Sequence, residues 1–396
     1  MLREEWAPVP PARASNRPWL VIGDGHAALR TALDESTTCT GPVVPVVVLG
    51  DRFQPHHNET LLRGLALARS GSSRIVLVHS GAGGGSLLRC AVAEEPGLSA
   101  TVIELSGGAT PQAVEAAVAV AGQQKSGWHE VVIDRAGGTW RSGWTEVDLK
   151  SGMSSRPLGT VLVTGGLGGL GIRVAGMLRA RLGVRAVLLD DIARAELAAD
   201  SIAMLTRLAA AGDVEVLDAD LADRAAVRSV LGGRIVNGIV HCAGEFRGGF
   251  VADATVSRLA AMQEPKVAGM HHVLAAVDRR AVRNLVTFGS IAARVPHRGM
   301  GSYALANELL RRATVAAAAD LPECSCLAFE WSLFSGAGVA HRTGAVRQAK
   351  AMGMPPVPLR SGLDVLLWSF ARSHTPADSL AVVGTGDLSF PARSRR

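Results

Sequence analysis

Short apolar runs alternate with stretches of helical periodicity along nearly the whole chain. In the first part, strand-like runs fall at residues 19–22, 43–49, 75–79, 100–105 and 130–134, with helical stretches at 59–69, 86–93 and 111–123. In the second part, strands are expected at 160–164, 186–189, 215–218, 238–241, 284–288, 326–330 and 380–383, with helices at 169–182, 256–277 and 302–318. Alternation at this spacing predicts an α/β fold with mostly parallel, doubly wound sheets.

A stretch of small and polar residues separates the two parts. Residues 137–157 combine glycine-rich and serine-rich segments, which is typical of a hairpin followed by a linker. At 396 residues two domains are expected, and each part is long enough to bury a core of its own. We therefore predict two Rossmann-like subdomains, residues 1–150 and residues 151–396.

Composition narrows the class of protein further. No apolar run reaches the ~18–20 residues of a membrane span, and the charged, proline-rich N-terminus does not resemble a secretory signal. Both observations predict a cytoplasmic protein. The five cysteines form no CxxC pair, which favours free and mostly buried thiols. The neighbours His56-His57 and His271-His272 are expected to point to different faces, so no metal site is predicted.

The net charge of +6 is unevenly distributed along the chain. Residues 1–150 carry 13 Lys and Arg against 15 Asp and Glu, whereas residues 151–396 carry 28 against 20. The basic second part fits an anionic cofactor or partner, and an ordinary surface imbalance explains it as well. There is no nucleic-acid motif or aromatic-interleaved basic stretch, so nucleic acid is not an expected partner.

A glycine-rich turn follows the first strand of the second part and opens a helix. Missing side chains let the backbone approach a pyrophosphate, and the helix N-terminus offers N–H donors. We predict that this turn binds a dinucleotide through Thr164, Gly165, Gly166, Leu167, Gly169, Leu170 and Gly171. The Gly23-x-Gly25 turn of the first part lacks a third glycine at the usual place and is predicted to be only a tight turn.

Acidic residues at the ends of the next two strands bear on the choice of cofactor. Asp190 and Asp191 follow the second strand, where a carboxylate usually binds the adenosine ribose and repels a 2′-phosphate. The pair alone favours NADH over NADPH, although Arg194 or Arg185 is able to approach such a phosphate. Asp220-Leu221 follow the third strand and are expected to flank the adenine, and a helix N-cap is the alternative for Asp220.

The chain contains a single tyrosine, Tyr303, which lies 13 positions after Ser290 and four before Asn307. Carbonyl reduction needs a hydride on carbon and a proton on the developing alkoxide. Tyr303 is able to supply the proton if a nearby cation lowers its pKa from about 10, and Ser290 is placed to hold the carbonyl oxygen. The simplest short-chain reductases have a lysine where Asn307 stands, but this chain offers Lys266, 37 residues before the tyrosine.

With lysine and asparagine exchanged in this way, the chain resembles the ketoreductase domains of type I polyketide synthases, within the short-chain dehydrogenase/reductase superfamily. The resemblance covers nearly the whole chain and rests on motifs at 159–166, 241–244, 265–269, 288–292 and 303–307. Residues 330–340 resemble the segment that covers the nicotinamide, and 353–356 resemble the end of the substrate lid. The first part resembles the family's structural subdomain, a truncated Rossmann fold that has lost its cofactor site.

The resemblance implies NADPH-dependent reduction of the 3-keto group of a β-ketoacyl chain on an acyl carrier protein, in a polyketide synthase with neighbouring domains. It implies that Tyr303 is the acid, Ser290 the carbonyl binder, and Lys266 and Asn307 a supporting pair. Ala243-Gly244 join the cofactor-binding residues. Docking of the carrier protein on the basic part is a further hypothesis, with candidate residues Arg294, Arg298, Arg342 and Arg347.

The chain departs from the family pattern at several positions. Arginine is frequent where Asp190-Asp191 stand, so NADH is kept beside NADPH. The Leu-Asp-Asp signature of one stereochemical class is absent near 246–248, and Val295 stands where the other class has tryptophan. Met300 replaces the usual glutamine. Two alternatives remain open: a free-standing short-chain dehydrogenase acting on a diffusible ketone, and a non-reducing scaffold or epimerase that binds cofactor.

Overall fold

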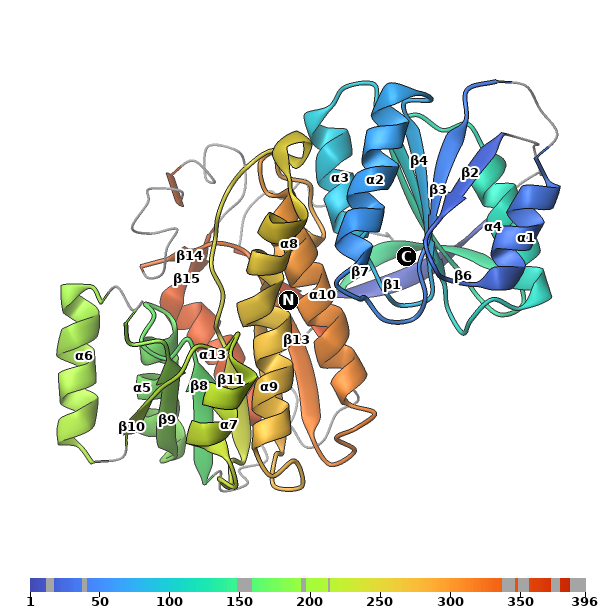
Figure 1. The fold of residues 1–396 in the computed structure, drawn as a ribbon. Helices are drawn as coiled ribbons and strands as arrows, with labels where there is room; N and C mark the ends of the chain where they lie inside the picture. Colours follow the sequence, from blue (N-terminus) through green and yellow to red (C-terminus); the bar gives the residue numbers. More distant parts are fainter. Residues whose placement is uncertain are drawn as a thin grey trace.

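The computed structural model describes residues 1–11, 18–37, 41–147, 159–193, 197–212, 214–336, 346–347, 356–371 and 378–384. Within these residues one continuous sheet has 14 strands, in the order β10-β9-β8-β11-β12-β13-β16-β1-β7-β6-β5-β4-β3-β2. Figure 1 shows the second part of the chain, green to red, around one end of this sheet and the first part, blue to cyan, around the other. The predicted α/β fold with a mostly parallel sheet is confirmed.

The second part forms a doubly wound sheet. Its strands are all parallel: β8 (Thr160–Thr164), β9 (Arg185–Asp190), β10 (Val214–Asp218), β11 (Gly238–His241), β12 (Asn284–Ser290), β13 (Ser325–Trp331) and β16 (Asp378–Val382). The strand order runs outward in both directions from β8 and its neighbour β11. Sheets of this kind bind ligands at the carboxyl ends of the strands where the order reverses, which here is the edge between β8 and β11.

Helices cover this sheet on both faces. They are α5 (Gly171–Leu182), α6 (Ala199–Ala210), α7 (Arg224–Leu231), α8 (Val256–Gln263), α9 (Gly269–Ala276), α10 (Gly301–Ala317) and α13 (Leu359–Ala371). The helix predicted over 256–277 is confirmed in extent, but a π-helical turn, Glu264–Ala268, lies within it between α8 and α9. Pro265 lies in this turn and has no N–H for an α-helical hydrogen bond. Turns of this kind are frequent at functional sites.

The first part has five parallel strands in simple chain order: β2 (Trp19–Ile22), β3 (Val44–Val48), β4 (Arg74–His79), β5 (Ser99–Leu105) and β6 (Trp128–Ile133). Its helices are α1 (Ala27–Glu35), α2 (His57–Ser70), α3 (Gly85–Glu94) and α4 (Pro111–Gly122). The predicted tight turn at Gly23 is confirmed. A Cβ on Gly23 would lie 2.2 Å from the carbonyl oxygen of Val48, and one on Gly25 would lie 2.4 Å from the carbonyl carbon of Leu49. Both glycines let the turn lie against the chain after β3.

Two antiparallel strands join the parts into one sheet. Strand β7 (Thr139–Glu146) forms the predicted hairpin with β6, and the Asp134 carboxylate accepts the Ala136 and Gly138 N–H groups at 2.9 Å in the turn. Strand β1 (Leu2–Val9) pairs with β7 along its length and with β16 at Leu2 and Arg3. The sequence analysis assigned no strand to these charged N-terminal residues. The predicted linker continues into residues 148–158, which lie outside the described residues.

Each part buries apolar side chains of its own, and a further core is shared. The shared cluster combines Leu87 and Leu88 of α3 with Ala304 and Leu305 of α10, and Tyr303 packs against it. The free thiols Cys90, Cys324 and Cys326 are buried as predicted, Cys242 is partly buried, and Cys39 lies outside the described residues. In the described part of the chain, no helix has the length and apolarity needed to cross a bilayer.

Candidate active site

The glycine-rich turn lies at the reversal point of the sheet, between the end of β8 and the start of α5. Gly165 has φ +62°, and a Cβ there would lie 2.9 Å from the Cα of Ala243. A Cβ on Gly166 would lie 2.7 Å from the Val163 carbonyl oxygen, and one on Gly171 only 2.1 Å from that of Gly165. Any side chain at these positions would therefore push the turn out of shape, and the backbone stays open in front of the N-terminus of α5.

The rest of the turn is tied to the neighbouring structure. The Gly169 carbonyl accepts a hydrogen bond from the Arg173 guanidinium at 2.6 Å, and Leu170 is the residue from which α5 starts. Both oxygens of Asp190 are used, because they accept the Leu167 N–H at 2.9 Å and the Asp191 N–H at 3.0 Å. Burial raises the pKa of Asp190, and the hydrogen bonds from backbone N–H groups oppose this rise. Asp190 thus holds the glycine-rich turn in place.

Two arginines and one aspartate were also expected near the cofactor. Arg185 lies at the opposite end of β9 from Asp190 and pairs with Glu215 at 3.0 Å, so it is remote from a phosphate at the turn. Arg194 lies outside the described residues. The Asp220 carboxylate accepts the Ala222 N–H at 2.9 Å, and the cap of α7 is instead Asp223, so the alternative of a helix N-cap at Asp220 is wrong.

Leu221 is buried, and its carbonyl oxygen is 2.8 Å from Nδ1 of His272 on α9. Like Asp220, it follows β10 at the carboxyl edge of the sheet, the same edge as the glycine-rich turn.

The four predicted catalytic residues come from three separate elements. Ser290 ends β12, Lys266 lies in the π-helical turn, and α10 carries Tyr303 and Asn307 one turn apart. Hydrogen bonding by Ser290 lowers the pKa of the Tyr303 phenol, so the two side chains lie close together. The Lys266 Nζ lies 5.8 Å from the centroid of the Tyr303 ring and donates to the Phe288 carbonyl oxygen at 3.4 Å. The structure therefore brings serine, tyrosine and lysine together.

Burial shifts the proton affinity of two of these groups. It raises the pKa of Tyr303 above its ordinary 10, while hydrogen bonding by Ser290 and Asn307 lowers it. The pKa of Tyr303 is therefore raised overall, whereas the sequence analysis expected a nearby cation to lower it. Burial also lowers the pKa of Lys266 to about 8. Near neutral pH Tyr303 carries its proton and Lys266 keeps a positive charge, so the pair suits donation of a proton.

A buried histidine, which the sequence analysis did not select, supports Lys266. His241 Nε2 lies 2.8 Å from the Lys266 carbonyl oxygen, and its Nδ1 lies 2.7 Å from the Thr164 hydroxyl. Burial lowers the pKa of His241 to about 3, so the ring is neutral. Its Nε2–H donates to the carbonyl and its Nδ1 accepts from Thr164. Because His241 and Thr164 are also paired in register on β11 and β8, the cofactor turn and the lysine are physically linked.

Gly244 and Asn307 complete the surroundings of the lysine and the tyrosine. A Cβ on Gly244 would lie 2.6 Å from Cε of Lys266, so a side chain there would displace the lysine. The Asn307 amide donates to the Tyr303 carbonyl oxygen at 2.7 Å. The Asn307 Oδ1 atom is buried and has no hydrogen-bond partner among the described residues. It is therefore free to accept a hydrogen bond from a water or a ligand group.

Comparison with known proteins places this arrangement in a family. Residues 159–335 match the model of the KR domain. These residues, which include the glycine-rich turn and the four predicted catalytic residues, are similar to a KR domain. The chain is 29% identical over 415 residues to polyketide synthase GfsB of Streptomyces halstedii, covering 91% of this chain and 7% of that protein. It is 31% identical over 253 residues to spectinabilin polyketide synthase system protein NorB of Streptomyces orinoci, covering 59% and 11%. The chain thus spans a small fraction of the length of these relatives.

Solved structures extend the likeness to both parts of the chain. A-type ketoreductases from a modular polyketide synthase superpose with a TM-score of 0.78 at 21% identity, covering 97% of this chain and 93% of theirs. The ketoreductase from the first module of phoslactomycin biosynthesis in Streptomyces sp. HK803 gives 0.77 at 21% identity, covering 96% and 92%. The chain therefore has the fold of polyketide-synthase ketoreductases, with a match to the KR domain over residues 159–335.

The sequence analysis placed Arg294 among the exposed arginines that bind a carrier protein, and this prediction is wrong. Its guanidinium is buried between Glu330, at 2.9 Å, and Glu4 of β1, at 2.6 Å, and it lies 5.3 Å from the Trp144 ring. Arg298 and Arg347 are exposed, and Arg342 lies outside the described residues. Of the segment compared with the nicotinamide cover, residues 337–340 lie outside the described residues, and of the segment compared with the end of the lid, residues 353–355 do.

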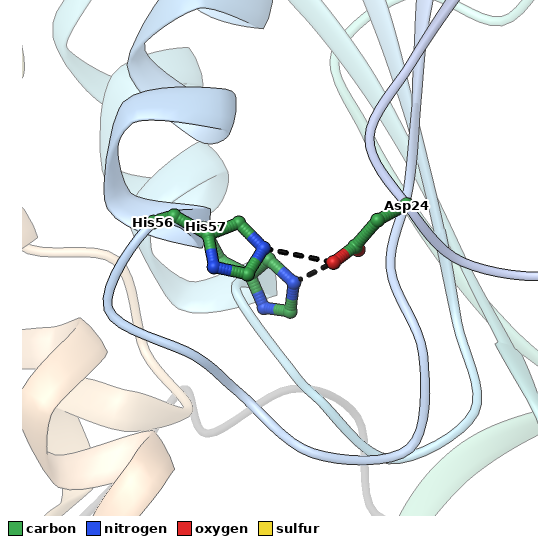
Figure 2. Close-up of side chains that lie close together, drawn as sticks. All are labelled: Asp24, His56 and His57. Atoms are coloured by element: carbon green, nitrogen blue, oxygen red, sulfur yellow. Dashed lines mark hydrogen bonds and ion pairs between the residues drawn. The ribbon is translucent and has the colours of Figure 1, made fainter.

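The first part also contains a group with the composition of a metal site, shown in Figure 2. His56 Nε2 and His57 Nε2 lie 2.8 and 3.0 Å from the two oxygens of Asp24. The expectation that these adjacent histidines point apart is wrong, because His56 precedes α2 and is not held by its geometry. The Gln54 N–H donates to His57 Nδ1 at 3.0 Å, so the proton of the neutral ring is on Nε2. A metal-bound imidazole has the opposite arrangement, and the group is instead held by hydrogen bonds.

Proposed function

We propose that this ketoreductase domain reduces the 3-keto group of a β-ketoacyl thioester on an acyl carrier protein to a 3-hydroxyl, with NADPH as the reductant. The observation that carries the proposal is the convergence of Ser290, Tyr303 and Lys266 at the carboxyl edge of the sheet, beside the glycine-rich turn. The resemblance to polyketide-synthase ketoreductases supplies the substrate class. The lengths of the relatives support neighbouring synthase domains.

The chemistry of each residue follows from its position. When bound, the reduced cofactor would supply the hydride for the carbonyl carbon. Ser290 donates a hydrogen bond to the carbonyl oxygen and fixes its direction. Tyr303 gives its phenolic proton to the same oxygen as negative charge develops there, and the positive charge of Lys266, 5.8 Å from the centroid of the ring, favours the resulting phenolate. Asn307, with its free Oδ1, holds the Tyr303 helix and accepts a hydrogen bond from a water that replaces the proton.

The residues around the turn fit a dinucleotide. Gly165, Gly166 and Gly171 allow a turn that side chains would push out of shape, so its backbone can approach a pyrophosphate, and the α5 N-terminus offers N–H donors. NADPH is favoured over NADH because Asp190 spends both oxygens on backbone N–H groups, which leaves only Asp191 to oppose a 2′-phosphate. The affinity of each cofactor, measured by the fluorescence of the reduced nicotinamide, tests this choice. Tighter binding of NADH would contradict it.

We also infer that residues 1–150 act as a structural subdomain and residues 151–396 as the catalytic one. The five parallel strands β2 to β6 follow one another in chain order without a reversal, so they offer no switch point for a nucleotide. The Gly23 turn is filled by the chain after β3. Loss of cofactor binding in Gly165→Ala, but not in Gly23 variants that fold, would agree with one site per chain.

Turnover of a simple ketone tests the activity directly. The purified protein is expected to oxidise NADPH in the presence of a decalone, and Tyr303→Phe is expected to abolish this while cofactor binding persists. Unchanged turnover in Tyr303→Phe would refute the assignment. Comparison of a carrier-bound with a free β-ketoacyl thioester then separates a synthase domain from a reductase of diffusible ketones. Carrier binding that weakens steeply with salt would support docking on the basic part.

A further inference from the structure

Helix α3 belongs to the first part of the chain, but it is buried on nearly every side. Eight of its residues are buried, and they include the charged Arg89 and Glu94. The helix packs against α10, which carries Tyr303, and against the short 3₁₀ turn Val251–Asp253. In Figure 1 it stands beside the upper end of α10. A helix this deeply enclosed touches the active-site elements directly.

The first charged contact runs from α10 to the N-terminus of α3. Glu308, which follows Asn307, accepts hydrogen bonds from the Ser86 N–H at 2.9 Å and the Ser86 hydroxyl at 2.7 Å. It also accepts the Gly84 N–H at 3.3 Å and pairs with Arg312 at 3.2 Å. An anion at a helix N-terminus interacts favourably with its free N–H groups. This contact fixes the rotation of α10 one residue from Asn307 and five from Tyr303.

The second contact holds the segment that begins at Ser290. A single 3₁₀ turn, Ile291–Ala293, starts at Ser290, whose hydroxyl accepts the Ala292 N–H at 3.2 Å. At the other end of this turn Arg89 donates to the carbonyl oxygens of Ala293, at 3.0 Å, and Arg294, at 2.5 Å. Arg89 is itself held by an ion pair with Glu130 and by the Trp128 ring, 4.7 Å away.

The third contact lies at the last turn of α3. The Glu94 carboxylate accepts the Gly299 N–H at 2.7 Å and the Val251 N–H at 2.6 Å. Gly299 precedes Met300, the N-cap of α10, and Val251 follows the segment that carries Phe246, whose ring meets the Tyr303 ring edge-on at 5.3 Å. One helix therefore binds the Ser290 turn, the start of the Tyr303 helix and the segment in front of the tyrosine.

We propose that α3 sets the position of Ser290 relative to Tyr303, and that Arg89 and Glu308 are positioning residues for the reduction. This inference rests on the proposed function. Neither side chain touches the reacting atoms. Arg89 acts through the carbonyl oxygens of the Ser290 turn, and Glu308 acts through α10. The first part of the chain thereby contributes to catalysis through geometry, without a cofactor or substrate contact of its own.

Arg89→Met tests the proposal. It removes both carbonyl contacts but keeps most of the side-chain volume, so the Ser290 turn is expected to shift. A displacement of ~1 Å at a catalytic group costs on the order of 100-fold in rate, so a 10- to 100-fold fall in kcat is expected. Cofactor affinity is expected to stay unchanged, because the binding turn is built on β8, β9 and α5. Arg89→Lys, which keeps the charge but cannot reach both carbonyls and Glu130, is expected to fall between.

Arg30→Met is the matched control. Arg30 lies on α1, beside the edge strand β2, and donates to the Gly23 carbonyl oxygen at 2.8 Å, so kcat should stay at the wild-type value. The single tyrosine supplies a second measurement, since its ultraviolet titration in Arg89→Met should move to higher pH as its bond with Ser290 weakens. A folded Arg89→Met, or Arg89→Lys if the former does not fold, with wild-type kcat and wild-type titration would overturn the proposal. If the wild type itself reduces no ketone, the proposed function fails, and the titration still tests the positioning.

Discussion

The hydrogen bonding between Ser290 and Tyr303 predicts how the pKa of Tyr303 changes when Ser290 is replaced. Burial raises the pKa of the Tyr303 phenol, and the Ser290 hydroxyl is the first of two groups that lower it. A hydroxyl that donates to a phenolate stabilises the charged form. Ser290→Ala removes that donor, so the pKa of Tyr303 should rise further.

The size of the rise follows from the strength of such a bond. A hydrogen bond to a charged group contributes about 1.5–3 kcal/mol. Since one pKa unit corresponds to about 1.36 kcal/mol, the expected increase is roughly 1–2 units. A water that enters the space left by the hydroxyl would reduce the effect toward the lower figure.

The assay is the ultraviolet absorbance of tyrosinate as a function of pH. Tyr303 is the only tyrosine in the chain, so the whole signal reports one phenol, and Tyr303→Phe must abolish it. Ser369→Ala is the control, because that hydroxyl donates to the Leu366 carbonyl oxygen within α13 and should leave the titration unchanged. Circular dichroism over the same pH range shows that the fold is retained. A tyrosine that titrates at the same or a lower pH in Ser290→Ala would refute the reasoning.

Three further predictions concern the residues around this pair. Burial lowers the pKa of Lys266 to about 8, so its charge is present below that pH and is lost above it. The kcat should therefore fall as the pH rises through 8. A flat profile of kcat up to pH 10 would contradict this role. Gly165→Ala should abolish cofactor binding, measured by nicotinamide fluorescence. Gly183 has a similar positive φ but open space around it, so Gly183→Ala should bind cofactor normally and lose only ~1 kcal/mol of stability. Arg294→Met leaves two carboxylates without their buried partner and should cost about 3–5 kcal/mol in denaturant unfolding; a loss below about 1 kcal/mol would show the pair to be dispensable.

Most of the strands, and the proximity of the predicted catalytic residues, could be predicted from the sequence, because both leave local signals. Buried parallel strands such as β8 and β11 are continuous apolar runs, and their predicted bounds agree with the structure. Serine, tyrosine and asparagine lie within 18 residues on one strand–helix unit, so their spacing alone indicated a shared site. Strand β1 was missed because most of its side chains are exposed or half-exposed and its partners lie far along the chain.

The sequence could not predict side-chain interactions between residues that lie far apart along the chain. Arg294 looked like a surface arginine, but it finds Glu330 on β13 and Glu4 on β1. Asp190 looked like a ribose ligand, but its carboxylate turns to the backbone of the glycine-rich turn. His241 lies in a motif of the sequence, but its role depends on its register opposite Thr164 on the neighbouring strand, which the structure shows. Each of these side chains has a partner that no local spacing reveals.

The seam between β1 and β16 has a consequence for how the protein is made. Leu2 and Arg3 pair with Leu380 and Ala381, and Arg3 forms an ion pair with Asp378 at 2.6 Å. While the ribosome extends the chain, β1 can dock on β7 early, but its other edge stays open until the distant strand β16 has been synthesised. An unpaired edge of this kind invites association with other chains. Such long-range closure is also slow, so completion of the sheet is expected to be a late step at which nascent molecules are most prone to aggregate.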